Sequence, residues 1–392
     1  MTETYGLVLA GGGAKGVYQI GAWRALRELD IRIGRVVGTS VGAMNGALVT
    51  LGNYEGAVEI WQSMSIERGF RLPEPLRVPD NLFSLKNADI LIRELWRNHG
   101  LDISPLRASL ERQISEKALR ASKIDFGLVT FEIRRRKPLY LYKNQIPDGR
   151  LMDYIMASAA YPGLKRPEIE GQIFMDGGVA DNVPIRMLQR RQKDHFIVVN
   201  IGDTGLPRDL DPNLNLIYIK PLHSLGHAFE FRPETASVKM EMGWYDTMKA
   251  FGKFSGEWMY FPNGEYQRLR DELGDNVVSG LEYAARLYGL DRLRVCTAEQ
   301  FVRELLDCDR VSADKFRTFR SHIDPPALLR SLYDGRLKEY NLSGDILLQL
   351  AQGLAAENPQ RPRARAMAQK VMPGILRAAE AVLHLRRFME GD

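Results

Sequence analysis

The sequence predicts an α/β fold with a mostly parallel central sheet, followed by an α-helical region. Apolar runs at 5–10 and 35–37 each lead through glycines into a stretch whose apolar residues have helical spacing. This alternation is typical of parallel sheets covered by helices. Beyond about residue 264 the strand signals fade, so we expect an α/β domain over 1–263 and a helical region over 264–392. The helices expected there cover 266–288, 298–306, 326–333, 345–355 and 374–389.

The first expected strand ends in a glycine loop, 11–16, and a helix is predicted from there to about residue 29. The first N–H groups of a helix have no partner within the helix, and the helix dipole adds positive potential. Glycine lets a ligand oxygen approach because no Cβ stands in the way. The loop is therefore a candidate anion site, formed by Gly11, Gly12, Gly13, Ala14, Lys15 and Gly16, with a positive charge on Lys15.

The same loop matches the dinucleotide pattern G-x-G-x-x-G at Gly11, Gly13 and Gly16. That pattern also requires an acidic residue after the second strand, to bind the ribose hydroxyl. Here the second strand runs directly into Gly38-Thr39-Ser40. A nicotinamide-dependent oxidoreductase therefore stays only as an alternative interpretation.

The second motif is a G-x-S-x-G serine elbow, which exposes a hydroxyl on a sharp strand-to-helix turn. A helix of small residues is expected over 41–49, and glycines before and after the serine let strand and helix approach closely. Ser40 is the candidate nucleophile. The rest of the elbow consists of Gly38, Thr39, Val41 and Gly42.

The third motif, Asp176-Gly177-Gly178, follows a short expected strand at 172–175. A serine hydroxyl needs a base to remove its proton, and two glycines leave the Asp176 carboxylate open. The next helix is expected to begin at 181–184, with Asn182 as its cap. Nucleophile, anion site and base are the three roles that acyl transfer needs. The sequence therefore predicts a serine acyl hydrolase.

A histidine could be the base instead, as in triads with the order Ser, Asp, His. The candidates are His195, His223 and His227. However, the elbow follows only the second expected strand, and these histidines do not lie in loops typical of a site. His223 and His227 have i, i+4 spacing but lack the glutamate of the zinc motif H-E-x-x-H, so no metal site is expected. No cofactor is expected either.

Together these motifs resemble the patatin-like phospholipases, lipid acyl hydrolases with a Ser–Asp dyad. The resemblance rests on 11–16, 38–42 and the block from 157–163 to 175–184. It implies a three-layer α/β/α core with Ser40 as nucleophile, Asp176 as general base and the 11–16 amides as oxyanion hole. It also implies phospholipid or lysophospholipid esters as substrates. Lys15 stands where many members have arginine, which keeps the charge but loses the bidentate geometry. A catalytically silent lipid- or partner-binding protein on this fold is the main alternative.

Composition is ordinary for a globular protein, with 45% hydrophobic and 26% charged residues, and the net charge is +5. A basic hairpin tip is expected at 134–137. It could contact an anionic membrane, or it could be a solvated turn. No nucleic-acid motif accompanies the charge, and nothing in the sequence indicates an oligomeric state. Two cysteines, the absence of a signal peptide and the absence of a long apolar run lead us to expect a cytoplasmic protein, peripheral at the inner membrane surface.

Two further segments have alternative interpretations. Residues 66–103 are interrupted by Pro73, Pro75 and Pro79 and could form a lid, an acyl-chain pocket wall or ordinary packing. The terminal helix at 374–389 follows an expected linker at 357–362. It could lie at a membrane interface, although docking on its own domain is commoner.

Overall fold

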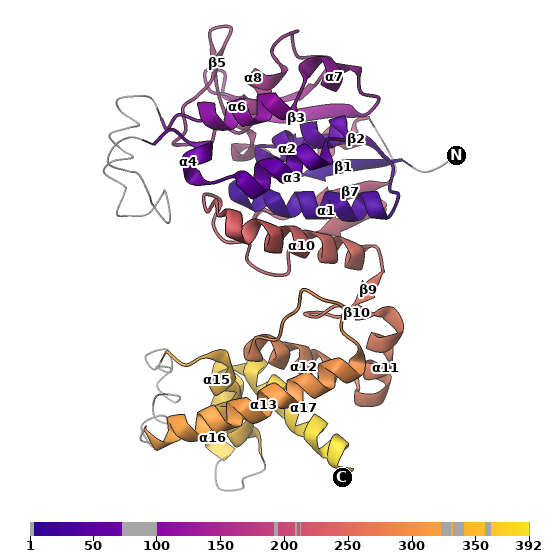
Figure 1. The fold of residues 1–392 in the computed structure, drawn as a ribbon, viewed down its shortest axis with the longest axis vertical. Helices are drawn as coiled ribbons and strands as arrows, with labels where there is room; N and C mark the ends of the chain where they lie inside the picture. Colours follow the sequence, from indigo (N-terminus) through magenta and orange to yellow (C-terminus); the bar gives the residue numbers. More distant parts are fainter. Residues whose placement is uncertain are drawn as a thin grey trace. The chain divides into compact units, whose positions relative to one another are not determined.

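The computed structural model describes residues 4–72, 100–191, 195–207, 210–211, 213–322, 331, 341–356 and 362–391. Most of the segment expected as a lid or pocket wall, most of the helix expected at 326–333 and the linker up to residue 361 lie outside these residues. The chain divides into two compact units, Met1–Phe251 and Gly252–Asp392 (Figure 1).

The first unit is built on an eight-stranded sheet of order β5-β6-β3-β2-β1-β7-β8, with β4 beside β3. The pairs β1–β2, β1–β7, β2–β3 and β7–β8 are parallel, which confirms the predicted mostly parallel sheet. The antiparallel pairs involve β3–β4, β3–β6 and β5–β6. The strands are β1 (Tyr5–Leu9), β2 (Ile33–Thr39), β3 (Asp125–Glu132), β4 (Lys137–Tyr142), β5 (Glu168–Ile169), β6 (Gln172–Asp176), β7 (Phe196–Val199) and β8 (Leu216–Ile219).

Helices cover both faces of this sheet. Successive strand residues point to opposite faces: Phe126 contacts the α2 side at Gly46, whereas the position of Gly127 faces Met187 of α9. The three-layer α/β/α arrangement is therefore present. The helices are η1 (Gly13–Gly16), α1 (Val17–Glu28), α2 (Val41–Leu51), α3 (Tyr54–Ser63), α4 (Ile66–Gly69), α6 (Ser104–Gln113), α7 (Glu116–Ala121), α8 (Leu151–Ser158), η3 (Gly177–Val179), α9 (Ile185–Gln189) and α10 (Pro233–Ala250).

Strands β2 and β6 both pair with the same edge of β3, one after the other along its length. Strand β4 pairs with the other edge of β3. Strand β2 ends with Thr39 opposite Val129, and β6 ends with Asp176 opposite the next residue, Thr130. This register brings the residue after β2, Ser40, next to Asp176, although the two are far apart in the sequence.

Two local expectations have different outcomes. The basic segment does form a hairpin, because β3 and β4 are antiparallel and joined by a turn at 133–136. The helix expected at 181–184 begins later, and the prediction of Asn182 as its cap is wrong. Pro184 is the residue before α9, and the Asn182 side chain instead donates to Gly11 O at 3.2 Å.

The second unit is helical and has its own hydrophobic core. The single helix expected at 266–288 is two helices, broken at Gly274, whose φ of 85° ends α11. Residue 362, expected in a linker, begins a helix. Helix α17 packs on α12 and α15 within this unit, which favours the docked interpretation. The elements are β9 (Phe254–Ser255), β10 (Phe261–Pro262), α11 (Asn263–Leu273), α12 (Asp275–Tyr288), α13 (Ala298–Ser321), α15 (Gly344–Ala355), α16 (Pro362–Val371) and α17 (Pro373–Glu390).

A buried carboxylate joins the helices of the second unit. Asp309 of α13, 1% exposed, forms an ion pair with Arg386 of α17. Its Oδ1 accepts hydrogen bonds from Tyr288 Oη and from the amides of Gln349 and Gln352. A buried charge needs such partners to be tolerated. No helix in the described part of the chain is long and apolar enough to cross a membrane.

Candidate active site

Ser40 lies at the turn between β2 and α2 with a φ of 56° and a ψ of −128°. A non-glycine residue with this backbone conformation is strained, and such strain is often found at functional sites. A Cβ on Gly38 would lie 2.2 Å from Gly42 O, and one on Gly42 would lie 2.1 Å from Leu9 O. Strand and helix therefore approach so closely that only glycine fits at both positions.

Two hydroxyl groups hold the main chain of this turn. Ser158 Oγ, which is fully buried, accepts a hydrogen bond from Ser40 N at 2.9 Å and donates one to Val129 O at 2.6 Å. Thr39 Oγ1 donates to Asp181 O at 2.8 Å. These bonds fix the backbone of the elbow without using the Ser40 hydroxyl.

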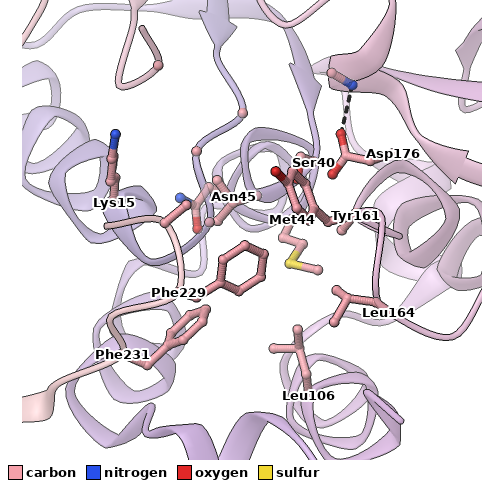
Figure 2. Close-up of a pocket in the computed structure, with 18 of the residues that line it drawn as sticks. Lys15, Ser40, Met44, Asn45, Leu106, Tyr161, Leu164, Asp176, Phe229 and Phe231 are labelled. Atoms are coloured by element: carbon pink, nitrogen blue, oxygen red, sulfur yellow. Dashed lines mark hydrogen bonds between the residues drawn. The ribbon is translucent and has the colours of Figure 1, made fainter. Parts of the chain in front are cut away.

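Asp176 is the acidic group beside Ser40 (Figure 2). Its side chain is buried, and Oδ1 accepts a hydrogen bond of 2.7 Å from Gly178 N. Burial raises the pKa of Asp176 from 3.8 to about 6, although the Ser40 hydroxyl and the Gly178 amide both lower it. Oδ2 accepts no hydrogen bond of normal geometry from the described residues. The Ser40 hydroxyl is nevertheless near enough to lower the pKa of Asp176. Catalytic hydrogen bonds are often long before substrate binds.

The glycine loop leaves two N–H groups available beside Ser40. No described residue accepts a hydrogen bond from the amides of Gly12 and Gly13. Gly13 has a φ of 57°, and a Cβ there would lie 2.2 Å from Ala228 O, so this position requires glycine. Three other amides of the loop already donate to backbone oxygens: Gly11 N to Asn182 O (3.2 Å), Ala14 N to Ala228 O (2.7 Å) and Lys15 N to Gly12 O (3.2 Å).

A buried polar network supports both ends of this loop. Gln19 Nε2 donates to Ala10 O at 2.8 Å, and Asn45 Nδ2 donates to Gly16 O at 2.9 Å. Asn45 also donates to Gln19 Oε1 and accepts from Trp61 Nε1. Because these buried groups satisfy one another, the network can hold the loop in one conformation.

The dyad opens into an apolar cavity of about 300 Å³. Figure 2 shows Ser40 and Asp176 at one end of the hollow, with Leu106 and Phe231 at the other. Aliphatic and aromatic side chains make up most of the wall, as expected for a site that takes an apolar ligand. They include Met44, Leu48, Ile60, Trp61, Met64, Phe70, Leu106, Leu110, Leu164, Phe229 and Phe231.

Other candidate groups lie outside this arrangement. None of the histidines in the described part of the chain lines the cavity, so the alternative triad has no geometric support. The described residues also contain no cluster of His, Cys, Asp and Glu that could hold a metal. Lys15 lies at the rim, its ammonium 3.8 Å from the exposed Asp203, and points away from the apolar side chains (Figure 2).

Sequence reasoning predicted Ser40 and Asp176 as candidate reacting groups but missed the residues that position them. Ser158 was within a matching block, yet no role was expected for it. Asn45 had a detectable signal, because it is the one polar residue in the apolar run 41–49. A buried polar residue in such a run needs partners, and here it supports the glycine loop.

Residues 7–188 match the family model for patatin-like phospholipases. This part of the chain belongs to the patatin-like phospholipase family. Members are generally serine lipid hydrolases, and the mixed, mostly parallel sheet is of patatin type. The match includes Ser40, Asp176 and the whole glycine loop.

The chain also has curated relatives. An uncharacterized NTE family protein of Mycobacterium tuberculosis is 28% identical over 211 residues, which cover 53% of this chain and 52% of that protein. Lysophospholipase nte1 of Aspergillus terreus is 27% identical over 218 residues, 54% of this chain and 13% of that protein. The chain thus spans about half the length, or less, of these relatives. The crystal structure of VipD from Legionella pneumophila has a TM-score of 0.39 and 14% identity, covering 98% of this chain and 90% of that one.

Proposed function

We propose that the chain is a serine acyl hydrolase of the phospholipase A or lysophospholipase type, which cleaves carboxylic esters of lipids. One observation carries the proposal. A hydroxyl, a buried carboxylate and two free amide N–H groups line one end of a single apolar cavity. These groups can attack, accept a proton and stabilise an oxyanion while the cavity holds an acyl chain.

In the acylation step, Asp176 accepts the proton of the Ser40 hydroxyl as its oxygen attacks the ester carbonyl carbon. The carbonyl oxygen becomes an oxyanion, which accepts hydrogen bonds from the amides of Gly12 and Gly13. The tetrahedral intermediate then collapses to an acyl-serine. The leaving alkoxide takes the proton from Asp176 and departs as an alcohol.

In the deacylation step, a water molecule takes the place of the alcohol. Asp176 accepts one of its protons as the water oxygen attacks the acyl carbon. Collapse of the second intermediate releases the fatty acid and returns the proton to Ser40. The raised pKa of Asp176 suits both steps, since a base near neutral pKa accepts protons more effectively than an ordinary carboxylate.

The apolar wall indicates the class of substrate. Each buried methylene group of an acyl chain contributes about 0.8 kcal/mol, so longer chains should bind better until the cavity is full. Neither a metal nor a cofactor is needed for this chemistry. The apolar wall supports a lipid acyl ester, and the match to patatin-like phospholipases supports a phospholipid or lysophospholipid as the proposed substrate.

The test is hydrolysis of p-nitrophenyl esters with increasing acyl length by the wild type, Ser40→Ala and Asp176→Asn. Asp203→Asn is the matched control, because it removes an exposed carboxylate from the same rim. We expect both dyad variants to lose activity and the control to keep it. Activity in Ser40→Ala would contradict the proposal. A wild type that binds lipid but releases no product would support the silent binding protein instead.

A further inference from the structure

The β3–β4 turn projects beyond the dyad at the edge of the sheet where the parallel strands end. Strand β3 continues past Thr130, which pairs with Asp176, to Glu132. The turn follows at 133–136, and Ile133 N donates to Ile173 O of β6 at 3.0 Å. Lys137 pairs back with Glu132, so the tip lies at most about two residues beyond Glu132. With about 3.3 Å per strand residue, the tip lies roughly 7–13 Å beyond the level of the dyad. A surface that contacts this tip therefore faces the end of the sheet that carries the active site.

This tip carries an excess of positive charge. Arg134, Arg135, Arg136 and Lys137 are exposed, and only Arg135 has an ion pair among the described residues, with the buried Glu132 at 3.6 Å. The neighbouring β5–β6 segment adds two basic and two acidic residues over 165–172. The two segments together, 132–137 and 165–172, thus contain six basic and three acidic residues. The unpaired cations are available to an external anion.

Exposed apolar side chains lie at the same end of the sheet. Tyr161 is 47% exposed, Ile173 41% and Val179 50%. The first and third line the cavity, and Ile173 adjoins the basic tip. They are three of the five large hydrophobic side chains exposed in the described part of the first unit. Exposed apolar side chains beside a cluster of unpaired cations are suited to contact with a surface that is both apolar and anionic.

We propose that the basic tip and the apolar side chains around the cavity mouth dock onto an anionic lipid bilayer. The cations approach the phosphate groups, and Tyr161, Ile173 and Val179 enter the interface. A nucleic acid would engage the charges but leave the apolar side chains in water. The inference rests on the proposed function, because docking would present lipid esters directly to Ser40.

The experiment is co-sedimentation of the full chain with vesicles. Ether-linked lipids are used because they lack carboxylic esters, which separates binding from hydrolysis. Phosphatidylcholine vesicles are compared with vesicles that also contain phosphatidylglycerol. The test variant is Arg134→Ser/Arg136→Ser/Lys137→Ser, which keeps the Arg135–Glu132 pair. The matched control, Arg32→Ser/Lys117→Ser/Lys123→Ser, removes the same charge from exposed positions. Arg32 and Lys123 immediately or closely precede β2 and β3, at the end of the sheet where the parallel strands begin.

We expect the wild type to bind the anionic vesicles more tightly and the control to bind like the wild type. Each charge removed should lower the partition coefficient about fivefold at low salt. Loss of three charges should therefore lower the partition coefficient of the test variant by up to about 100-fold. Its hydrolysis of soluble esters should be unchanged. Wild-type binding by the test variant, equal loss in the control, or indifference to phosphatidylglycerol would each overturn the docking proposal. Docking without any Ser40-dependent hydrolysis would instead refute the proposed function.

Discussion

As pH rises, Asp176→Asn should become progressively more stable relative to the wild type, while the substitution removes hydrolysis. Asp176 is 3% exposed, and burial raises the pKa of its carboxyl group from 3.8 to about 6. The native state therefore binds this proton more tightly than the unfolded state does. Its contribution to stability is fully present below the unfolded pKa of 3.8 and is lost as pH rises through about 6.

The size of this effect follows from the shift. A shift of about two pKa units corresponds to about 3 kcal/mol between low pH and neutral pH. Asparagine remains neutral and avoids this loss. It also places an amide N–H₂ group at the position of Oδ2, which has no full hydrogen bond. An unsatisfied buried donor costs about 1–3 kcal/mol, but this cost does not change with pH.

Urea denaturation followed by tryptophan fluorescence, from about pH 4 to about pH 8, measures the difference between the two proteins. The second unit is identical in both, so it contributes equally to each pair of curves. The free energy of unfolding of Asp176→Asn relative to the wild type should rise by about 2–2.5 kcal/mol across this range, because the unfolded carboxyl is already partly ionised at pH 4. The control Asp203→Asn should show no such rise. If the difference in unfolding free energy between the two proteins were the same at every pH, the argument that burial raises the pKa of Asp176 would be refuted.

Three further predictions concern activity. In the wild type, kcat/KM on a soluble ester should rise with pH with a midpoint near 6, as Asp176 ionises; a flat profile from about pH 5 to about pH 8 would contradict this. Ser158→Ala should reduce kcat and stability, the latter by about 1–3 kcal/mol, because Ser40 N loses its buried acceptor; unchanged kcat with normal folding would argue against a positioning role. Gly13→Ala should lower kcat by about 10²–10³, since its Cβ would clash with Ala228 O and move the oxyanion donors; wild-type kcat would contradict the argument that this position requires glycine.

The parts of the fold that could be predicted have local sequence signals. Apolar runs that end in glycine gave β1, β2 and the helices after them, and the basic turn between two β-like runs gave the β3–β4 hairpin. The break between α11 and α12 was missed because Gly274 lies inside a continuous helical pattern, where one glycine is normally tolerated. The compact units divide at Phe251, and the domain boundary expected at 263 stays a prediction.

The candidate reacting groups of the site could be predicted because each lies in a short motif, but the residues that support them could not. Ser158 meets Ser40 only because α8 and β3 pack beside the elbow, across 118 positions of sequence. Asn182 was assigned to a helix cap from its local sequence, whereas tertiary contact directs it to Gly11 O. Such roles depend on long-range packing, which a local pattern does not encode.

The most direct test of the central claim is labelling with an alkyl fluorophosphonate, which leaves a stable adduct on an activated serine. Mass spectrometry of the digested protein should find one adduct, on the peptide that contains Ser40. Asp176→Asn should react much more slowly, because the serine loses its base, and Ser40→Ala should not be labelled. An adduct on another residue, or equal labelling of Ser40→Ala, would contradict the assignment of Ser40 as the nucleophile.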